Sequence, residues 1–238
     1  MSNFNDIFGS ARPKEDGDHW LTVSDLMAGL MIVFLFIAIA FMRHVSIERD
    51  KIKDVAVAYK KNQVAIYEAL TKEFEADLKK WDASIDQETL AFQFSSPDVL
   101  FGKGEFNLKP KFENILSEFI PRYLLVLDTF KESIDEIRIE GHTSSEWAAD
   151  TNANDAYFLN MNLSQARTQS VLKFAYFLDA LSEEQQSWIK SSFAAVGLAS
   201  SHLKFNNDGT ENEEKSRRVS FRVITNADIQ IRKIIEGL

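Results

Sequence analysis

The first residue that could do chemistry is a single carboxylate in an apolar segment. Between Trp20 and Met42 the chain reads "WLTVSDLMAGLMIVFLFIAIAFM", and Asp25 is its one charged residue. An aspartate at the centre of a membrane span costs about 2.5–3.5 kcal/mol on insertion scales, and less near the interface. Such residues commonly carry protons or ions, because protonation removes the charge that apolar surroundings disfavour. The alternative is that Asp25 merely caps the helix that follows it, and the residues alone leave both roles open.

The segment around Asp25 has the length of a membrane span. The run from Leu26 to Met42 is apolar or small throughout and, with the preceding turn, reaches roughly the 20 residues that a bilayer requires. A cleaved signal peptide is the competing interpretation, because Ala38–Ala40 is similar to a cleavage site. However, the preceding residues are acidic, and the run exceeds the roughly 7–15 apolar residues of a signal peptide. We therefore predict an uncleaved transmembrane helix over 19–44, after a polar head over 1–18.

The segment after the span is predicted to be a helical linker over 45–87, since it contains neither proline nor glycine. Six of its apolar residues recur three or four positions apart and mark one face of a helix: Tyr67, Leu70, Phe74, Leu78, Trp81 and Ile85. This stripe could form a coiled-coil seam between two copies, or it could pack on the chain's own folded domain. The pattern leaves both open.

Beyond the linker the pattern changes to alternating strands and helices. The predicted strands are Thr89–Phe94, Ile134–Thr143, 193–199 and Arg217–Thr225. The predicted helices are Lys111–Phe130, interrupted near Pro121, and Ser164–Leu181, capped by Ser164. This order predicts an α/β two-layer sandwich over 88–225, followed by a helical tail over 226–238.

Composition excludes several classes of function. The net charge of -9 and the pI near 5.0 argue against a nucleic-acid partner, which would need clustered Lys and Arg. The chain has no cysteine, and its four histidines are scattered, so a metal site is not expected. It also has neither a Gly-rich phosphate loop nor a nucleophile elbow. We therefore expect no enzyme activity, no cofactor and no metal.

The segment "WLTVSDLMAGLMIVFLF" (Trp20–Phe36) resembles the transmembrane signature of the MotB, ExbD and TolR class of stator subunits. In that class an aromatic residue precedes an Asp, which is followed by "LM" or "FM" and an apolar run. The form here is most similar to the B subunits of the Zorya antiphage motors. The resemblance implies that Asp25 carries the ion, either proton or sodium.

The same resemblance implies the partners and the location. In the family, a homodimer of B subunits is enclosed by five A subunits, so a MotA-like or ZorA-like membrane subunit is the expected partner of this chain. The chain is then a single-pass inner-membrane protein with its head in the cytoplasm and its C-terminal domain in the periplasm. The Lys and Arg residues that flank the span, counted alone, would place that domain in the cytoplasm. A long translocated domain weakens that rule.

Four segments taken together resemble the OmpA-like peptidoglycan-binding domain: "VLFGKGEFNLKP", "IRIEGHTSS", "NMNLSQARTQSV" and "SRRVSFRV". In that family the ligand is the diaminopimelate of the peptide stem. Its carboxylate meets an Arg, and its amine meets the Asp that follows "GHT". The resemblance assigns the carboxylate to Arg167 and places Asn160 and Leu163 beside the peptide. Ser144 stands where the family has the Asp, which removes the charge partner of the amine.

The loop after Ser144 is longer than the usual loop of the OmpA-like family. Its three acids, Glu146, Asp150 and Asp155, could each replace the missing Asp, and the sequence does not rank them. Trp147 in the same loop is either an exposed contact or packed cover. His142 is interpreted as a structural hydrogen-bonding residue at a strand end rather than as a ligand.

These features together predict an ion-conducting stator subunit of a proton-motive-force-driven inner-membrane motor, anchored to peptidoglycan and acting in antiphage defence. In such a motor the wall anchor keeps the B pair from turning, so that ion flow rotates the ring. A flagellar MotB-like or TolR/ExbD-like energiser is one alternative. A passive OmpA-like cell-wall tether is another, from a different class. A tether has no use for an acid in its span, and Asp25 is the feature that separates the two.

Overall fold

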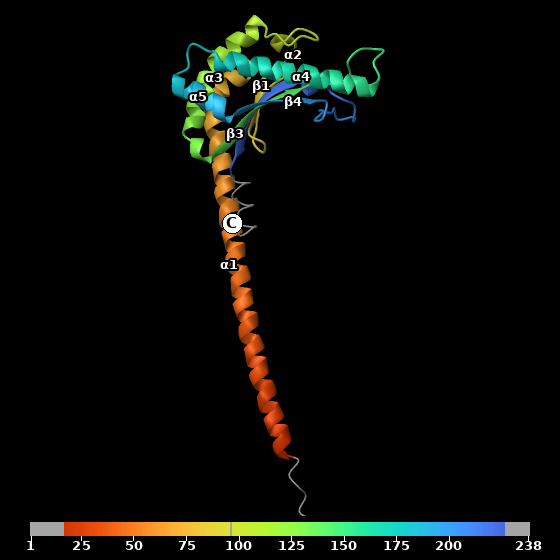
Figure 1. The fold of residues 1–238 in the computed structure, drawn as a ribbon. Coiled ribbons are helices and arrows are strands. Elements are labelled where there is room, and N and C mark those ends of the chain that lie inside the picture. The colour runs from red at the N-terminus through yellow and green to blue at the C-terminus, as the bar shows by residue number, and fades with distance from the viewer. Residues whose placement is uncertain (1–16, 96, 227–238) are drawn as a thin grey trace, which may run out of the picture. The chain divides into compact units, whose positions relative to one another are not determined.

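The computed structural model of this chain describes residues 17–95 and 97–226. Most of the predicted head and all but the first residue of the predicted tail lie outside these ranges. The chain divides into two units, residues 1–53 and 54–238, and each is described by itself. Helix α1 (Gly17–Leu78) contributes residues to both units (Figure 1).

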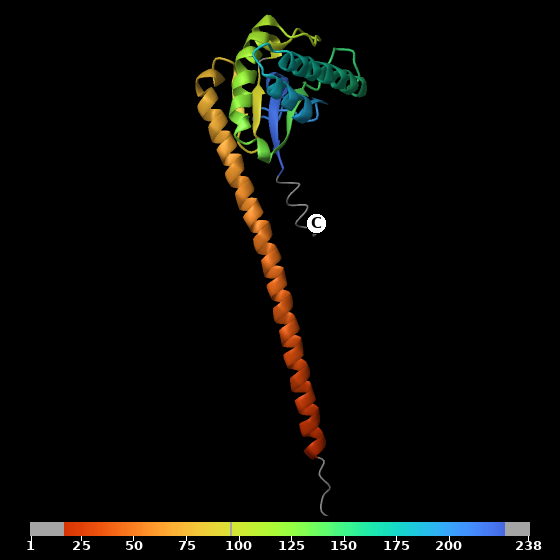
Figure 2. The same ribbon diagram turned by 60° about the vertical axis from the view of Figure 1, so that its left-hand side comes forward.

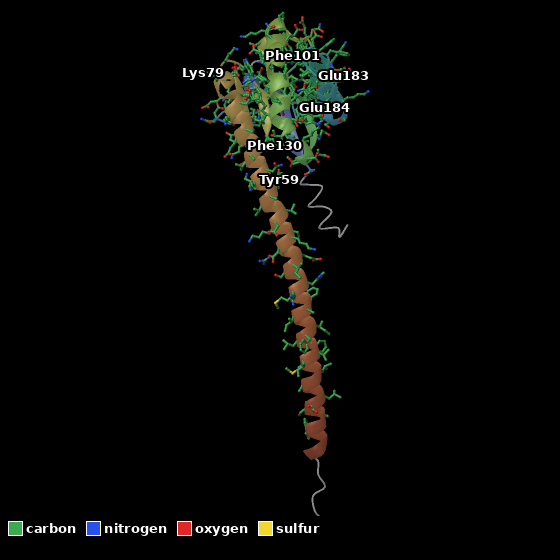
Figure 3. All side chains as sticks on the ribbon, turned by 90° about the vertical axis from the view of Figure 1, so that its left-hand side faces the viewer. Tyr59, Lys79, Phe101, Phe130, Glu183 and Glu184 are labelled. Atoms are coloured by element: carbon green, nitrogen blue, oxygen red, sulfur yellow. The ribbon has the colours of Figure 1, made fainter. Side chains whose placement is uncertain are left out.

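The first unit consists, in its described part, of the beginning of α1. From Val23 to Met42 every large apolar side chain is at least 48% exposed, and Figure 3 shows these side chains projecting outward along the helix. Among the described residues this is the one helix long and apolar enough to cross a membrane. Such an apolar surface is what a membrane-spanning helix presents to lipid.

The second unit contains a five-stranded sheet in the order β1-β2-β5-β3-β4. All neighbouring strands are antiparallel except β3 and β4, which are parallel. The strands are β1 (Ala83–Asp86), β2 (Ala91–Phe94), β3 (Ile134–His142), β4 (Phe193–Ala199) and β5 (Arg218–Thr225). The helices between them are α2 (Pro97–Leu100), α3 (Pro110–Asp128), the 3-10 turn η1 (Lys131–Ser133), α4 (Ala153–Tyr176), α5 (Glu183–Ser192) and α6 (Glu213–Ser216). The predicted fold class, an N-terminal helix followed by an α/β two-layer sandwich, is confirmed.

One face of the sheet is covered by the last turns of α1 together with α3 and α4 (Figures 1 and 2). Side chains alternate across a strand, and those on this face are apolar. Phe92 of β2 and Phe221 of β5 are paired in register and fully buried. Phe119 of α3 packs on both, with ring centroids 4.6 and 5.0 Å away. The core of the domain is therefore an aromatic layer between the sheet and the helices.

The apolar stripe of the linker packs on this same core. Leu70 and Phe74 are fully buried, and Trp81 is 4% exposed. The Phe74 ring lies 5.2 Å from that of Phe92. Arg122 of α3 ties the two helices together from the solvent side. Of the two open interpretations of the stripe, packing on the chain's own domain is correct in this structure.

Arg122 makes that tie by contacts with three residues of α1. It donates hydrogen bonds to the carboxylates of Glu73, at 2.7 Å, and Asp77, at 2.8 Å. Its guanidinium carbon also lies 4.7 Å from the centre of the Phe74 ring, which is the geometry of a cation–π contact.

Three details of the predicted elements are wrong. The linker was expected to be helical to residue 87, but β1 (Ala83–Asp86) lies inside that range and pairs with β2. Pro121 was expected to interrupt its helix, but it lies inside α3, where buried apolar residues on both sides hold the helix together. Ser164 was expected to cap a helix and instead lies within α4, which starts at Ala153. Helix α5, with Ser182 as its N-cap, was not predicted.

Candidate functional site

The predicted ligand-binding residues come together around one pocket of about 570 Å³, at the end of the sheet where β3 leads into its loop. The pocket has three walls: the loop that begins at Phe101 (labelled in Figure 3), the loop that follows β3, and the middle of α4. Its lining residues are Phe101, Gly102, Lys103, Gly104, Thr143, Ser144, Glu146, Trp147, Asn160, Leu163, Arg167 and Arg217. All four predicted residues of this site, Ser144, Asn160, Leu163 and Arg167, are among them.

Two glycines let α4 lie directly on the sheet beside the pocket. Gly141 of β3 and Gly197 of β4 are paired in register. A Cβ at Gly141 would lie 2.7 Å from the backbone oxygen of Ser164, and one at Gly197 would lie 2.5 Å from the backbone nitrogen of Gln165. Both contacts are shorter than atoms allow, so a larger residue at either position would push α4 outward. The glycines therefore set the distance between the sheet and α4, the helix that carries Arg167.

Polar side chains at the same point fix the helix along the strand direction. The Ser164 hydroxyl accepts from the backbone N–H of Ala199 at 3.2 Å. The Gln165 amide accepts from the N–H of Gly197 at 2.8 Å and donates to the carbonyl of Ala195 at 3.1 Å. Ser164 is therefore a buried link to the sheet rather than a helix cap, which explains why it belongs to the "NLSQAR" segment.

Arg167 lines the pocket from α4 and is held there by the loop that begins at Phe101. Its Nε donates to the carbonyl of Glu105 at 2.8 Å, and its Nη2 donates to the carbonyl of Gly102 at 3.1 Å. Its guanidinium carbon lies 4.8 Å from the centre of the Phe101 ring. Burial, and to a smaller extent the charge of Arg217, lowers the pKa of Arg167 to about 10. Arg167 is therefore charged at neutral pH and held rigidly, which favours a planar anionic partner such as a carboxylate.

Asn160, on the same helix as Arg167, holds the loop that follows β3. Its side chain is 3% exposed and donates to the carbonyl oxygens of Ser144, at 3.2 Å, and Glu146, at 3.1 Å. On its other side the same loop is tied by Ser145, whose backbone N–H and hydroxyl both donate to the Glu211 carboxylate. Asn160 thus acts in this structure by shaping the loop that follows β3.

The structure distinguishes the three acids that could replace the missing Asp. Glu146 lines the pocket. Asp155 is engaged at the start of α4, where its N–H and carboxylate both bond to the N-cap residue Asn152. Asp150 is exposed and is not part of the pocket lining. Glu146 is therefore the acid positioned to meet an amine in the pocket.

The pocket has an excess of positive charge. Lys103, Arg167 and Arg217 line it, against the single carboxylate of Glu146. Arg217 also donates a hydrogen bond to the Glu213 carboxylate at 3.2 Å, so its charge is partly balanced. Lys103 was not predicted as a site residue, although it lies in the quoted segment "VLFGKGEF", and only the fold brings it into the same pocket lining as Arg167. The arrangement suits a ligand that carries more than one carboxylate and an amine.

A buried polar network lies behind the pocket, on the sheet face away from the helices. His142 is 5% exposed and Glu140 is 6% exposed, and their side chains approach to 3.6 Å. His142 Nε2 also lies 3.3 Å from the Ser220 hydroxyl. Burial lowers the pKa of His142, with Arg218 and His202 adding to this effect and Glu140 opposing it. His142 is therefore neutral at pH 7 and belongs to the scaffold, as predicted from the sequence.

Asp25 lies in the first unit and is treated separately. It is exposed and is surrounded in sequence by the exposed apolar side chains of α1. Because α1 begins at Gly17, Asp25 lies about two turns inside the helix. An N-cap residue precedes the first helical residue, so the capping alternative for Asp25 is wrong. Its role as an ion carrier stays a prediction.

Comparison with curated proteins found two relatives that match over nearly the whole chain. The Zorya protein ZorB of Escherichia coli (strain Crooks) is 56% identical over 97% of this chain and 98% of its own length. The Zorya protein ZorB of an Escherichia coli O139:H28 strain is 24% identical over 92% of this chain and 87% of its own.

Among solved structures, a MotB-like protein from Desulfovibrio vulgaris is similar with 20% sequence identity, covering 72% of this chain and 94% of that one, at a TM-score of 0.49. No family model matches the chain.

Proposed function

The chain belongs to the ZorB family of Zorya proteins, and from that premise we propose that it is the ion-carrying stator subunit of an inner-membrane motor that is held to peptidoglycan and acts in antiphage defence. The observation that carries the proposal is Asp25, a lone carboxylate inside a helix whose other side chains from Val23 to Met42 are uncharged and outward-facing. A wall tether without a motor needs no such residue.

The ion step takes place at the Asp25 carboxylate. The charged form is disfavoured in an apolar setting, and binding a proton neutralises it. One elementary charge that crosses 100 mV releases about 2.3 kcal/mol, which is enough to drive a step of a surrounding ring of subunits. The chain supplies the carboxylate, and a MotA-like or ZorA-like subunit supplies the rest of the path. A pair of these chains inside five such subunits is the assembly that we expect.

The pocket of the second unit supplies the fixed point. Arg167 binds a carboxylate of the peptide stem, and Glu146 takes the amine that the family's Asp would bind. Arg167 is presented by α4, which packs closely on the sheet at Gly197, and Glu146 by a loop that Asn160 of α4 holds in place. A rigid pocket loses little entropy on binding, which suits an anchor that must resist the turning force of the ring. In this proposal the domain lies in the periplasm, where the cell wall is.

The experiment that tests the motor is the substitution Asp25→Asn. It keeps the shape of the side chain and removes the group that binds and releases a proton. We expect phage protection to fall to the level of cells without the protein, while the amount of protein in the membrane is unchanged. Asp50→Asn is the matched control, because Asp50 is an exposed carboxylate of the same helix beyond the apolar run. Full protection by the Asp25→Asn chain would contradict the proposal.

A further inference from the structure

We propose that Trp147 forms a binding platform for a sugar ring of the glycan strand, so that the pocket holds the saccharide as well as the peptide stem. This inference rests on the proposed wall-binding function and extends it to a second part of the ligand. It concerns the long loop after β3, which the sequence resemblance left without a role.

Trp147 has the position that such a platform requires. It lines the pocket together with Glu146 and Arg167, and 36% of its surface is exposed. A ligand seated on Arg167 is therefore within the same cavity as the indole. Among the residues that the structure describes, none forms a hydrogen bond with the indole N–H, which is thus available to a hydroxyl or carbonyl of the ligand.

The backbone that leads into the platform is fixed before any ligand arrives. Immediately before Trp147, the carbonyl of Glu146 accepts from the buried Asn160 at 3.1 Å. Two residues before it, the N–H of Ser145 donates to Glu211 at 3.1 Å. An aromatic side chain has only two torsions to order. A ring held by such a backbone therefore binds with a small loss of entropy.

The chemistry of the indole distinguishes a sugar from the peptide. The charged ends of a stem peptide are met by the cations and the carboxylate of the pocket, and none of these offers an apolar flat surface. A pyranose ring has a face of C–H groups, and an exposed indole is the kind of surface on which such a face packs. Tryptophan is also suited to a place where one side is apolar and the other is wet. The pocket volume of about 570 Å³ is within the range of sites that hold ligands larger than one amino acid.

The test measures the affinity of the full chain, in mild detergent, for two soluble probes. One probe is the tetrapeptide stem alone, and the other is the same stem on its disaccharide. We expect the wild-type chain to bind the disaccharide probe roughly three- to tenfold more tightly. Trp147→Ala should abolish this difference and leave the affinity for the free peptide unchanged. Trp147→Phe keeps an aromatic ring and should keep part of the difference.

Phe158→Ala is the matched control, because Phe158 is an aromatic residue at the start of α4 that is 65% exposed and outside the pocket lining. It should leave both affinities as they are. Equal binding of the two probes by the wild-type chain would overturn the inference while leaving the wall-binding proposal intact. An equal loss for both probes in Trp147→Ala would also overturn it, because it would assign the indole a structural role. Failure of the wild-type chain to bind either probe would refute the proposed wall binding and this inference with it.

Discussion

Asp25 and Arg167 are the charged residues on which the two halves of the proposed function depend, and their surroundings are opposite. Asp25 has no hydrogen bond or ion pair among the described residues and lies between exposed apolar side chains. Arg167 is held by two backbone carbonyls and an aromatic ring. In the proposed function the first site is completed by other subunits, whereas the second is built within the chain. The difference predicts that changes near Asp25 alter activity alone, while changes near Arg167 alter folding or binding.

Placing the same substitution in both regions gives the largest expected contrast. Gly197→Ala would put a methyl group 2.5 Å from the backbone nitrogen of Gln165. Because backbone cannot move aside without shifting α4, we expect a loss of about 3 kcal/mol or more in the free energy of unfolding. Gly29→Ala in α1 meets nothing within 4 Å and should leave the unfolding of the domain unchanged. Thermal unfolding of the full chain in detergent, followed by near-UV circular dichroism, measures both. Equal melting of the two variants would contradict the close packing described for Gly197.

The next effect is on binding rather than folding. Arg167→Ala removes a charged donor from the pocket lining, and we expect roughly a tenfold to hundredfold loss of affinity for isolated cell-wall sacculi. Arg167→Lys keeps the charge but not the planar fork, and should recover only part of the affinity. Sedimentation of the full chain with sacculi measures this.

Two further variants sharpen the assignment. Arg138→Ala is the matched control, because Arg138 pairs with Glu136 at 2.7 Å and is not part of the pocket lining. Glu146→Gln should weaken the binding of a stem peptide with a free amine and leave an acetylated stem unaffected. If Arg167→Ala and Arg138→Ala bind sacculi equally well, Arg167 does not hold the ligand.

The smallest expected effect is a pH dependence confined to the second region. The folded state lowers the pKa of His142 through burial, from an ordinary value of 6.5. The unfolded chain therefore takes up the proton first, so stability is complete above about pH 6.5 and falls as the pH drops through that value. Glu140, Arg218, His202 and Arg222 face His142 or its partner Glu140 and change the size of this effect.

Melting temperatures of the wild-type and His142→Asn chains between about pH 7.5 and 5.5 measure the effect. We expect the melting temperature to fall more steeply with decreasing pH in the wild-type chain than in His142→Asn. Parallel slopes would show that another group titrates in this range.

The sequence alone was enough to identify Asp25 as a candidate site residue, but not enough to identify much of the pocket lining. The reason is physical. A carboxylate in an apolar run is unusual by itself, whatever the fold. Lys103, by contrast, gains a role only because its loop is folded against Arg167. The choice of Glu146 over Asp155 likewise required the position of the helix start at Asn152. Local signals did exist for two missed features: Asn152 with Asp155, and Ser182 with Gln185, both have the spacing of N-terminal helix caps.

Strand β1 was missed because it has only four residues and lies next to a strongly helical pattern. Its turns are made by Asp82 and Leu90, which adopt positive φ angles of 49° and 52°. Such an angle is uncommon for a leucine, so no turn signal marks Leu90 in the sequence. The tertiary pairing with β2 decides the conformation there.

The packing of the linker stripe determines which truncated fragments of this chain can fold. Gln63 is 4% exposed, and its amide donates to the backbone carbonyls of Gln87 and Glu88. A fragment that started at residue 88, where the pattern changes to strands, would lose this residue and all of the stripe. Phe92 and Phe119, which are now fully covered, would then face water, and such a fragment would aggregate. The smallest fragment that we expect to stay soluble by itself begins before Gln63, inside the segment that the sequence predicts to be a linker.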